Sequence, residues 1–318
     1  MKGATWLGLV IAVPLSAFGA GAQTWPARQI EMIVPYAAGG GVDIIFRSVA
    51  TAMSEHLGQN VVVVNRDGAS GTLGFNALAA ADPDGYTLGA GPTTPISSSP
   101  FLVKGVRYRV ESFEYICQVF ENVFAIVVGP HSEFKSAPDL LVAAAANPRG
   151  LSYGHAGAGS IPHLSVENLA DALKLKLQGV PFRGDSPMLQ VLLKGDLDFG
   201  VAGLSSLRGQ GVRVLAIFAD ERHQDLSEVP TAKEMGVTTP VPPGFNGVYA
   251  PKGLPAEVRE ALERSCAKAV ESDVVSRRIA NTGQTVRYLT GEQFHVRTAA
   301  DYAFKAGLLH RLGLDSQK

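Results

Sequence analysis

Hydrophobic positions in the first part of this chain alternate between short continuous runs and longer stretches with helical spacing. Ile30–Val34 and Val61–Asn65 are continuous runs, and the four valines of the second are typical of a strand buried on both faces of a parallel sheet. Between them, apolar residues recur on one helical face over residues 43–58. A further helix is predicted at residues 73–81 and a third strand at residues 86–89. This alternation predicts a doubly wound α/β lobe.

The same alternation recurs further along the chain. An apolar stretch at residues 115–128 is interrupted by Glu121 and Asn122, which indicates a strand that leaves one lobe and enters another. Residues 244–250 indicate a strand that returns beside it. Strands are also predicted at residues 151–153, 177–182, 197–201 and 212–218, and helices at residues 137–146, 187–194, 255–272 and 291–309, with another beginning at Pro162. The second lobe therefore repeats the first in outline.

The N-terminus has the pattern of an export signal. Lys2 is followed by an apolar run at residues 6–18, and Ala20-Gly21-Ala22 has the small-residue pattern of a signal-peptidase site. The run is shorter than the roughly 20 residues of a membrane-spanning helix, and no later segment qualifies as one. We expect cleavage after Ala22 and a soluble protein in the periplasm. The predicted ranges are residues 1–22 for the signal peptide, 23–122 for the first part of lobe 1, 123–244 for lobe 2, and 245–318 for the return strand and the C-terminal helices that complete lobe 1.

Charge and composition point to a small ligand. Charged residues make up 18% of the 318 residues and the net charge is −1, so nothing in the sequence favours nucleic acid or an anionic membrane as a partner. We expect a monomer without a cofactor. Cys117 and Cys266 lack the spacing of a metal or redox site, and the sequence fits a disulfide and two separate buried thiols equally well.

Two glycine-rich turns at helix starts are the main candidates for a binding site. Residues 35–41 and 154–160 each connect a predicted strand to a helix. A helix start exposes backbone N–H groups at the positive end of the helix dipole, and glycine lets a ligand approach the main chain, so each turn is a place for an anion. Thr93 and Thr94 follow the third strand at the same edge of the sheet. Neither turn has the spacing of a dinucleotide fingerprint or a P-loop, and Ser70 lacks the last glycine of a nucleophile elbow, which argues against an enzyme.

Three side chains near the second turn are further candidates. His155 and His163 flank it, but a metal site of this type needs three or four ligands, so we expect no metal. His163 at a helix start suits a hydrogen bond to a bound acid, support of the turn, or a capping role. Arg183 suits a two-point contact with a carboxylate, although an arginine in a turn is more often a surface residue.

Ordered sequence blocks resemble one known family over essentially the whole mature chain. The chain resembles the Bug family, the periplasmic substrate-binding proteins of tripartite tricarboxylate transporters. The resemblance is carried by Trp25-Pro26, by residues 35–43 (PYAAGGGVD), 57–59 (LGQ), 61–66, 82–88 (DPDGYTL), 152–154 (SYG) and 157–160 (GAGS) with His163-Leu164, and by residues 180–184 (VPFRG), 229–231 (VPT) and 250–253 (APKG).

The resemblance implies a type II periplasmic binding fold, α/β in class, with two doubly wound lobes joined by two crossing strands that close on one ligand. Family members bind small carboxylated molecules through main-chain N–H groups and ordered water in two facing loops. The implied partners are therefore a di- or tricarboxylate, or an aromatic carboxylate, and the membrane subunits of a transporter. The residues implied for the ligand are Tyr36, Ala38, Gly39, Gly40, Gly41, Asp43, Thr93, Thr94, Gly157, Ala158, Gly159, Ser160, His163, Arg183 and Gly184.

The sequence departs from the family pattern in two places. Val201-Ala202 stands where the family usually has a Phe-Asp pair, so a carboxylate that supports bound water is missing. The segment that follows, up to Val212, is shorter by about four residues, close to one helical turn. We expect both changes at the wall of the cleft, with a larger, more aromatic or less polar acid as one consequence.

Two other functions fit the same sequence. One is a ligand-binding adaptor of a signalling receptor, which the sequence does not separate from a transport receptor. The other is an exported enzyme that acts on a small organic acid, for which Ser160, His163 and Asp43 are the residues of suitable chemistry. Turnover of a bound acid would favour the enzyme.

Overall fold

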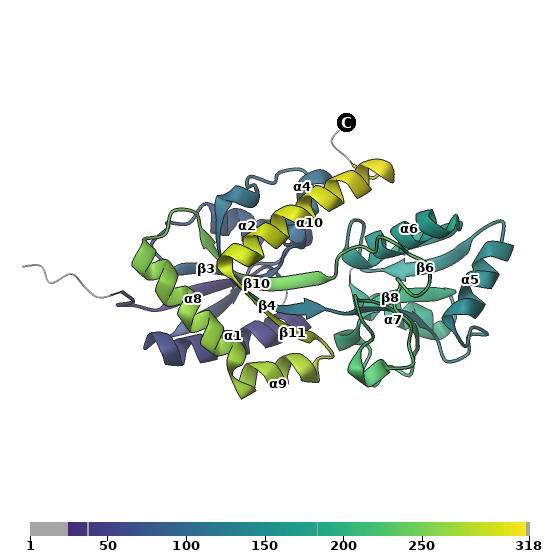
Figure 1. Cartoon of the computed structure of the whole chain (residues 1–318), viewed down its shortest axis with the longest axis horizontal. Helices are drawn as coiled ribbons and strands as arrows, with labels where there is room; N and C mark the ends of the chain where they lie inside the picture. The colour runs from purple at the N-terminus through teal and green to yellow at the C-terminus, as the bar shows by residue number, and fades with distance from the viewer. Residues whose placement is uncertain (1–24, 37, 183, 316–318) are drawn as a thin grey trace, which may run out of the picture.

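Two α/β lobes lie side by side in the computed structural model of the chain (Figure 1). The structure describes residues 25–36, 38–182 and 184–315. The expected signal peptide with its cleavage after Ala22 lies outside the described residues, and so does Arg183. None of the helices in the described part is long and apolar enough to cross a membrane.

Lobe 1 is built on a mixed sheet with the strand order β11-β4-β10-β3-β1-β2. Strands β2, β1 and β3 are parallel, as the alternation of strands and helices predicts, whereas β10 runs antiparallel to β3 and β4, and β11 antiparallel to β4. The strands are β1 (Ile30–Val34), β2 (Val61–Asn65), β3 (Thr87–Pro92), β4 (Phe113–Asn122), β10 (Gly244–Pro251) and β11 (Thr285–Thr290). The helices are α1 (Gly41–Leu57), α2 (Thr72–Ala79), α3 (Thr94–Ser97), α4 (Ser99–Leu102), α8 (Ala256–Glu271), α9 (Asp273–Asn281) and α10 (Gly291–Arg311).

Lobe 2 repeats this plan with a smaller mixed sheet in the order β7-β6-β8-β5-β9. Strands β7, β6 and β8 are parallel, and β5 runs antiparallel to β8 and β9. The strands are β5 (Phe124–Val128), β6 (Leu151–His155), β7 (Leu177–Pro181), β8 (Phe199–Gly203) and β9 (Arg213–Phe218). The helices are α5 (Ala137–Ala146), α6 (Ile161–Leu173) and α7 (Asp185–Lys194), with a short 3₁₀ turn η3 at Leu204–Ser206.

Two adjacent strands carry the chain between the lobes. β4 ends at Asn122, β5 begins at Phe124 in the other sheet, and β10 returns with Gly244 opposite Asn122. The Asn246 side chain donates to Oδ1 of Asn122 at 2.7 Å, which ties the crossing strands together. Val123 lies between β4 and β5, and its backbone N–H donates to Oε1 of Gln284, just before β11, at 2.8 Å. The link between the lobes is therefore narrow and hydrogen-bonded across its width.

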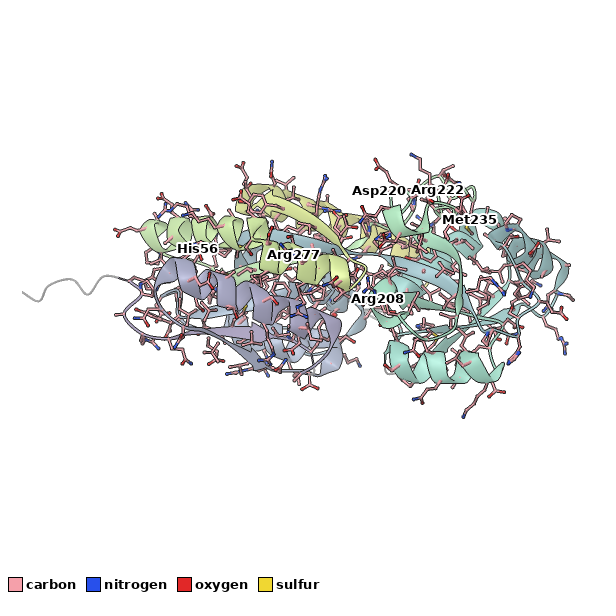
Figure 2. The ribbon with its side chains drawn as sticks, turned by 90° about the horizontal axis from the view of Figure 1, so that it is seen from below. His56, Arg208, Asp220, Arg222, Met235 and Arg277 are labelled. Carbon is pink, nitrogen blue, oxygen red and sulfur yellow. A yellow bond between two sulfur atoms is a disulfide. The ribbon has the colours of Figure 1, made fainter. Side chains whose placement is uncertain are left out.

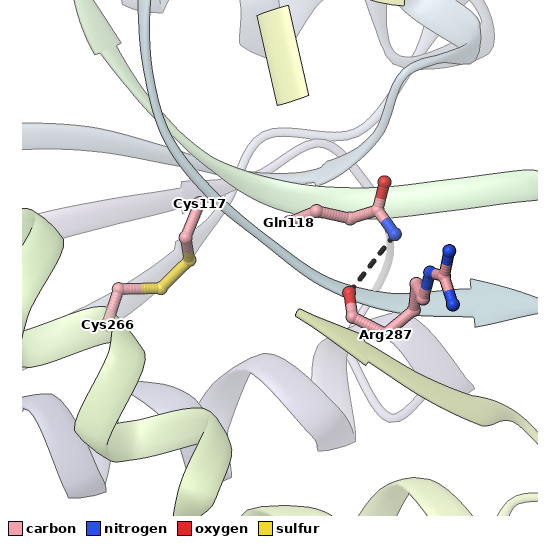
Figure 3. The surroundings of a disulfide bond; sticks show 4 residues. All are labelled: Cys117, Gln118, Cys266 and Arg287. Carbon is pink, nitrogen blue, oxygen red and sulfur yellow. Dashed lines mark hydrogen bonds between the residues drawn. A yellow bond between two sulfur atoms is a disulfide. The ribbon is translucent and has the colours of Figure 1, made fainter. Parts of the chain in front are cut away.

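A disulfide lies in the apolar core of lobe 1. Cys117 on β4 and Cys266 on α8 are bonded, with Cα atoms 6.4 Å apart and a sequence separation of 149 (Figure 3). Beside them, Nε2 of Gln118 donates to the carbonyl oxygen of Arg287 at 3.1 Å and holds β11 against β4. Of the two states that the sequence left open for these cysteines, the structure has the disulfide.

Candidate functional site

The first glycine turn is organised by Asp43, the third residue of α1. Its carboxylate is 2% exposed and accepts hydrogen bonds from the N–H of Gly39 and from Nε of Arg47, both at 2.9 Å. Asn65 donates to the other carboxylate oxygen at 2.8 Å and to the carbonyl of Tyr36 at 2.9 Å. Burial acts to raise the pKa of Asp43, but these hydrogen bonds outweigh it and hold the pKa below its ordinary value. Asp43 therefore shapes the turn from within the lobe and already uses the N–H of Gly39.

In the second glycine turn, a side chain again accepts a hydrogen bond from the N–H of the glycine four residues before it. The N–H of Gly159 donates to Nδ1 of His163 at 3.0 Å, as the N–H of Gly39 donates to Asp43. Ser160 is the N-cap of α6, and its hydroxyl accepts from the N–H of His163 at 3.3 Å. In this structure His163 therefore supports the turn with its ring and is capped through its backbone.

His155 stacks on His163, with ring centroids 4.3 Å apart. Nδ1 of His155 lies 2.9 Å from the carbonyl oxygen of Gly157, so this nitrogen carries the proton and donates. Burial lowers the pKa of both histidines, and the neighbouring His163 lowers that of His155 further, to about 4. Both rings are therefore neutral at pH 7. Within the described residues, no group of three potential metal ligands includes them.

A cavity of about 180 Å³ lies between the lobes beside the crossing strands. Lobe 1 contributes the first turn of α1, and lobe 2 contributes the first turn of α7 together with η3. The N-cap residues of these helices, Gly40 and Gly184, make no side-chain cap, so the first-turn N–H groups lack an intrahelical or capping partner. The described residues that line the cavity are Gly41, Val42, Ile45, Phe120, Asn122, Phe124, Asp185, Gly203, Ser205, Ser206 and Gln284.

Asp185 is the one charged side chain among the described residues that line this cavity. Its Oδ2 accepts from the hydroxyl of Ser206 at 2.8 Å and from the N–H of Gly203 at 3.0 Å. Burial raises the pKa of Asp185 in spite of these hydrogen bonds, which act to lower it. The remaining wall combines amide and hydroxyl groups with two phenylalanine rings, so the cavity suits a small polar molecule with some apolar surface.

The lobes meet closely at both glycine turns. A Cβ on Gly41 would lie 3.4 Å from Oγ of Ser205 across the cleft, in ordinary van der Waals contact. A Cβ on Gly159 would lie 1.8 Å from a methyl carbon of Leu102 in lobe 1. Gly159 also has a φ of +72°, which residues with a side chain rarely adopt. In this arrangement of the lobes, a side chain at Gly159 would require the Leu102 side chain to shift.

The structure brings some of the predicted ligand residues to the cavity. Gly41 lines it, and Gly184 lies at the adjacent start of α7. Ala38, Gly39 and Gly40 are exposed in the turn before α1.

The other predicted residues lie outside the cavity wall. The hydroxyl of buried Thr93 donates to the carbonyl of Phe245 at 3.4 Å, and Thr94 begins α3. Burial raises the pKa of Tyr36 to about 12. Residues 157–160 meet lobe 1 at the contact between Gly159 and Leu102.

Sequence reasoning did not single out several residues of the cavity wall. Gln284, Ser205 and Ser206 come from segments with no motif of their own, and Asn122 was interpreted as part of the crossing between the lobes rather than as a wall residue. The signal for Asp185 was its place in the predicted turn at residues 183–186, which also contains Gly184. Only Arg183 and Gly184 of this turn were assigned to the ligand.

Val201 and Ala202 do not lie at the wall of the cavity, contrary to expectation. Both side chains are fully buried, on opposite faces of β8 and in separate core clusters of lobe 2. On the lobe 2 side, the segment that follows contributes Gly203, Ser205 and Ser206 to the wall. The first departure from the family pattern, Val201-Ala202, therefore affects the packing beneath the wall, whereas the second, the segment up to Val212, includes residues of the wall itself.

A second hollow, of about 580 Å³, lies between the lobes on the opposite face of the crossing strands. Glu121 and Val123 face it, whereas Phe120 and Phe124 face the first cavity, as expected from the alternation of side chains along a strand. Its lobe 2 side is the loop after β9, where Asp220 and Arg222 lie (Figure 2). Charged residues of both signs line it, and Arg297 and Glu121 form an ion pair there.

The stability of the protein should depend on His155 between pH 6.5 and pH 4. The folded state holds the pKa of His155 at about 4, below the ordinary 6.5, so the unfolded chain binds the proton first as the pH falls. The stability that the protein gains by keeping His155 neutral is fully present above pH 6.5 and is lost as the pH falls through about 4. The pKa difference corresponds to about 3 kcal/mol.

The measurement is urea unfolding at several pH values for the wild type and for His155→Asn, which keeps an N–H donor but does not titrate. The variant should have a flatter profile in this window. His56→Asn removes an exposed histidine on α1 (Figure 2) and is the control for loss of a histidine as such. Parallel profiles of the wild type and His155→Asn would show that His155 is not the source of the pH dependence.

The chain is similar to known proteins of one family in both sequence and structure. The model described as TctC, tripartite tricarboxylate transporter family receptor, matches residues 45–314. Protein BugT of Bordetella pertussis is 30% identical over 313 residues, which cover 96% of each chain. The structure of Rpa4515 from R. palustris with adipate has a TM-score of 0.82 at 27% identity and covers 91% of this chain and 98% of that chain. MatC from Rhodopseudomonas palustris with bound malate has a TM-score of 0.77 at 27% identity and covers 90% and 100%.

These matches test the fold and the class of protein that the sequence predicts. The predicted α/β fold of two lobes, of the type II periplasmic binding kind, is confirmed, with mixed sheets in both lobes. The predicted class, a periplasmic binding protein and not an enzyme, is that of the family. The chain belongs to the TctC family, the receptors of tripartite tricarboxylate transporters.

Proposed function

We propose that this receptor captures a small carboxylated molecule between its lobes and delivers it to the membrane subunits of a tripartite tricarboxylate transporter. The observation that carries the proposal is the cavity where the uncapped starts of α1 and α7 meet from opposite lobes. The two R. palustris relatives were solved with adipate and with malate. The candidate ligands are di- and tricarboxylates and aromatic carboxylates.

Backbone dipoles would supply most of the attraction for the acid. No lysine, arginine or histidine is among the described residues of the cavity wall. An uncapped helix start contributes roughly 0.3–2 kcal/mol toward a carboxylate, so two starts and the neighbouring amide and hydroxyl groups act together. In this proposal the N–H groups of Gly40 and Gly41 bind the carboxylate, while Asp43 and His163 hold the two turns in shape.

Capture would occur by closure of the lobes about the crossing strands. The hinge residues in this proposal are those near Glu121-Asn122 and Gly244–Asn246. In the closed form residues 157–160 pack against α4, and the closed molecule presents a surface to the membrane subunits. We also propose that residues 1–22 are removed after Ala22 and that the mature protein acts in the periplasm as a monomer.

A thermal-shift screen of the mature protein tests the ligand class. The probes are di- and tricarboxylates, aromatic acids, amino acids and neutral sugars. A ligand at about 100 times its dissociation constant adds roughly 2.7 kcal/mol to the free energy of unfolding, which gives a clear shift. Shifts with acids alone support the proposal. A folded, ligand-free protein that no acid stabilises would refute it.

Gly159→Ala should weaken ligand binding by up to about tenfold, because its Cβ would displace the Leu102 side chain of the other lobe and so oppose this arrangement of the lobes. Gly195→Ala is the matched control, since Gly195 has a similar φ of +86° but no atom within 4 Å of the added Cβ. Both variants should lose about 1–2 kcal/mol of stability from backbone strain. Only Gly159→Ala should lose affinity, as measured by isothermal titration calorimetry, and Leu102→Ala should restore part of it. Equal affinities in the two glycine variants would contradict closure at this contact.

A further inference from the structure

The inter-lobe cavity contains a feature that binding of a carboxylate alone does not explain. Asp185 brings a carboxyl group to the wall, close to the helix starts that would bind an anion. Its Oδ2 is occupied by Ser206 and Gly203, at 2.8 Å and 3.0 Å, and these two contacts fix the side chain against η3. A second ligand carboxylate would lie beside the carboxyl group of Asp185 in a site without a basic side chain among its described residues, so the two groups would repel each other whenever both are ionised. The start of α1 therefore favours an anion more than the start of α7 does, because Asp185 offsets the attraction of the second helix start.

A carboxylate on a cavity wall is satisfied by a hydrogen-bond donor. It accepts from up to four directions, and Oδ2 of Asp185 already receives two donors from the protein. An ammonium or hydroxyl group on the ligand would supply the next donor and form a charge-assisted hydrogen bond. The lobe 1 side of the same cavity offers the first turn of α1 for the carboxylate of that ligand.

We propose that Asp185 determines which acids this receptor accepts, by receiving a hydrogen-bond-donating substituent, an ammonium or a hydroxyl, from an acid whose carboxylate lies at the start of α1. This inference rests on the proposed function and narrows it. The preferred ligand is an amino acid or a hydroxy acid rather than an unsubstituted diacid of the same length. Asp185 is thus a selectivity residue, and the helix starts supply the attraction common to all acids.

The test compares ligands that differ in one substituent. At four carbons the three probes are succinate, malate and aspartate, and the matched series is taken at the chain length that binds best in the thermal-shift screen. The wild type should bind the hydroxyl- or ammonium-bearing acid about 10- to 100-fold more tightly than the unsubstituted one, as measured by calorimetry. Comparison of the hydroxy acid with the amino acid shows whether the preferred donor is a hydroxyl or an ammonium group.

Asp185→Asn should remove this preference by weakening the substituted acid and sparing or strengthening the unsubstituted one. The matched control is Asp198→Asn, because Asp198 also accepts from a backbone N–H and a serine hydroxyl of lobe 2, both from Ser152, and does not line the inter-lobe cavity. Asp185→Ala also removes the carboxylate and should also lose the preference, so it provides a second readout if Asp185→Asn folds poorly. Thermal melts of each variant establish that it is folded.

The outcomes separate this inference from the function on which it rests. If no acid binds the wild type, capture of carboxylates is refuted. If acids bind but the unsubstituted member is preferred, or if the preference survives in Asp185→Asn, only the role of Asp185 is refuted. A preference that is present in the wild type and Asp198→Asn but lost in Asp185→Asn and Asp185→Ala establishes it.

Discussion

Replacing Asp301 with alanine is expected to lower the free energy of unfolding by about 3–5 kcal/mol. Lys305 on α10 is fully buried, and its Nζ donates to Asp301 at 2.7 Å and to the hydroxyl of Ser97 at 3.0 Å. Without the carboxylate, a buried ammonium would keep only one neutral partner. Because Ser97 belongs to α3, the loss would also weaken the contact of α10 with the segment that follows Thr93. Urea unfolding monitored by circular dichroism measures the effect.

An exposed pair of the same spacing provides the control for Asp301→Ala. Glu260 and Arg264 on α8 form an i,i+4 ion pair at 3.5 Å with both side chains more than half exposed. Glu260→Ala should therefore change stability by no more than about 1 kcal/mol. The double replacement Asp301→Leu with Lys305→Met should recover most of the loss, because it removes both buried charges. Equal losses for Asp301→Ala and Glu260→Ala would show that burial does not strengthen the pair.

The elements with a strong local pattern were predicted to the residue. β1, β2 and α5 have the predicted bounds, because apolar runs identify strands and a capping serine marks the start of α5. The prediction that β2 is buried on both faces is wrong, because β2 is the edge strand of the sheet and Val62 is exposed. α9 and β11 were not predicted. β11 is a largely exposed edge strand with no apolar alternation, and its position depends on pairing with β4. α9 is short and buries only Val275 and Ile279, too few positions for a recognisable helical pattern.

The parts of the site that lie within one short stretch of sequence were predictable. Each glycine turn lies between one strand and the helix that follows, so a short stretch of sequence contains it. The partners of the turns were present in the sequence as well, since Asp43 and His163 each lie four residues after the glycine whose N–H they accept. Asp43 was interpreted as a ligand contact, and His163 as a ligand contact, a support of the turn or a cap, because sequence spacing does not show which groups are already paired.

The wall of the cavity was not predictable, because it forms only when two lobes meet. Gly41 and Ser205 are far apart in the sequence and come together across the cleft. Asn122 and Gln284 reach the cavity from the crossing strand and from the segment before β11. Such contacts depend on how the lobes close, which no local pattern encodes.

Removal of the disulfide is expected to cost more stability than any surface change in this protein. Cys117 and Cys266 are separated by 149 residues, and the loop-entropy relation gives about 5 kcal/mol for a closed loop of this length. Both side chains are fully buried, so Cys117→Ala with Cys266→Ala also loses some packing in the core. Urea unfolding of the oxidised wild type, the reduced wild type and the double variant measures the loss, and reductant should not affect the double variant. An identical unfolding midpoint for the oxidised and reduced wild type would contradict the prediction.

The position of the bridge explains why its loss should affect folding rather than ligand binding. The chain leaves lobe 1 after β4 and returns with β10 and α8 only after completing lobe 2. The bond between β4 and α8 joins these two halves of lobe 1. It therefore lowers the conformational entropy of the unfolded chain, in which the two halves would otherwise be far apart. It does not connect lobe 1 to lobe 2, so it leaves the crossing strands free to bend. The dissociation constant of the ligand should therefore be the same for the oxidised protein and for the folded fraction of the double variant, and a weaker constant in the variant would mean that the bridge also shapes the cavity wall through Phe120 and Asn122.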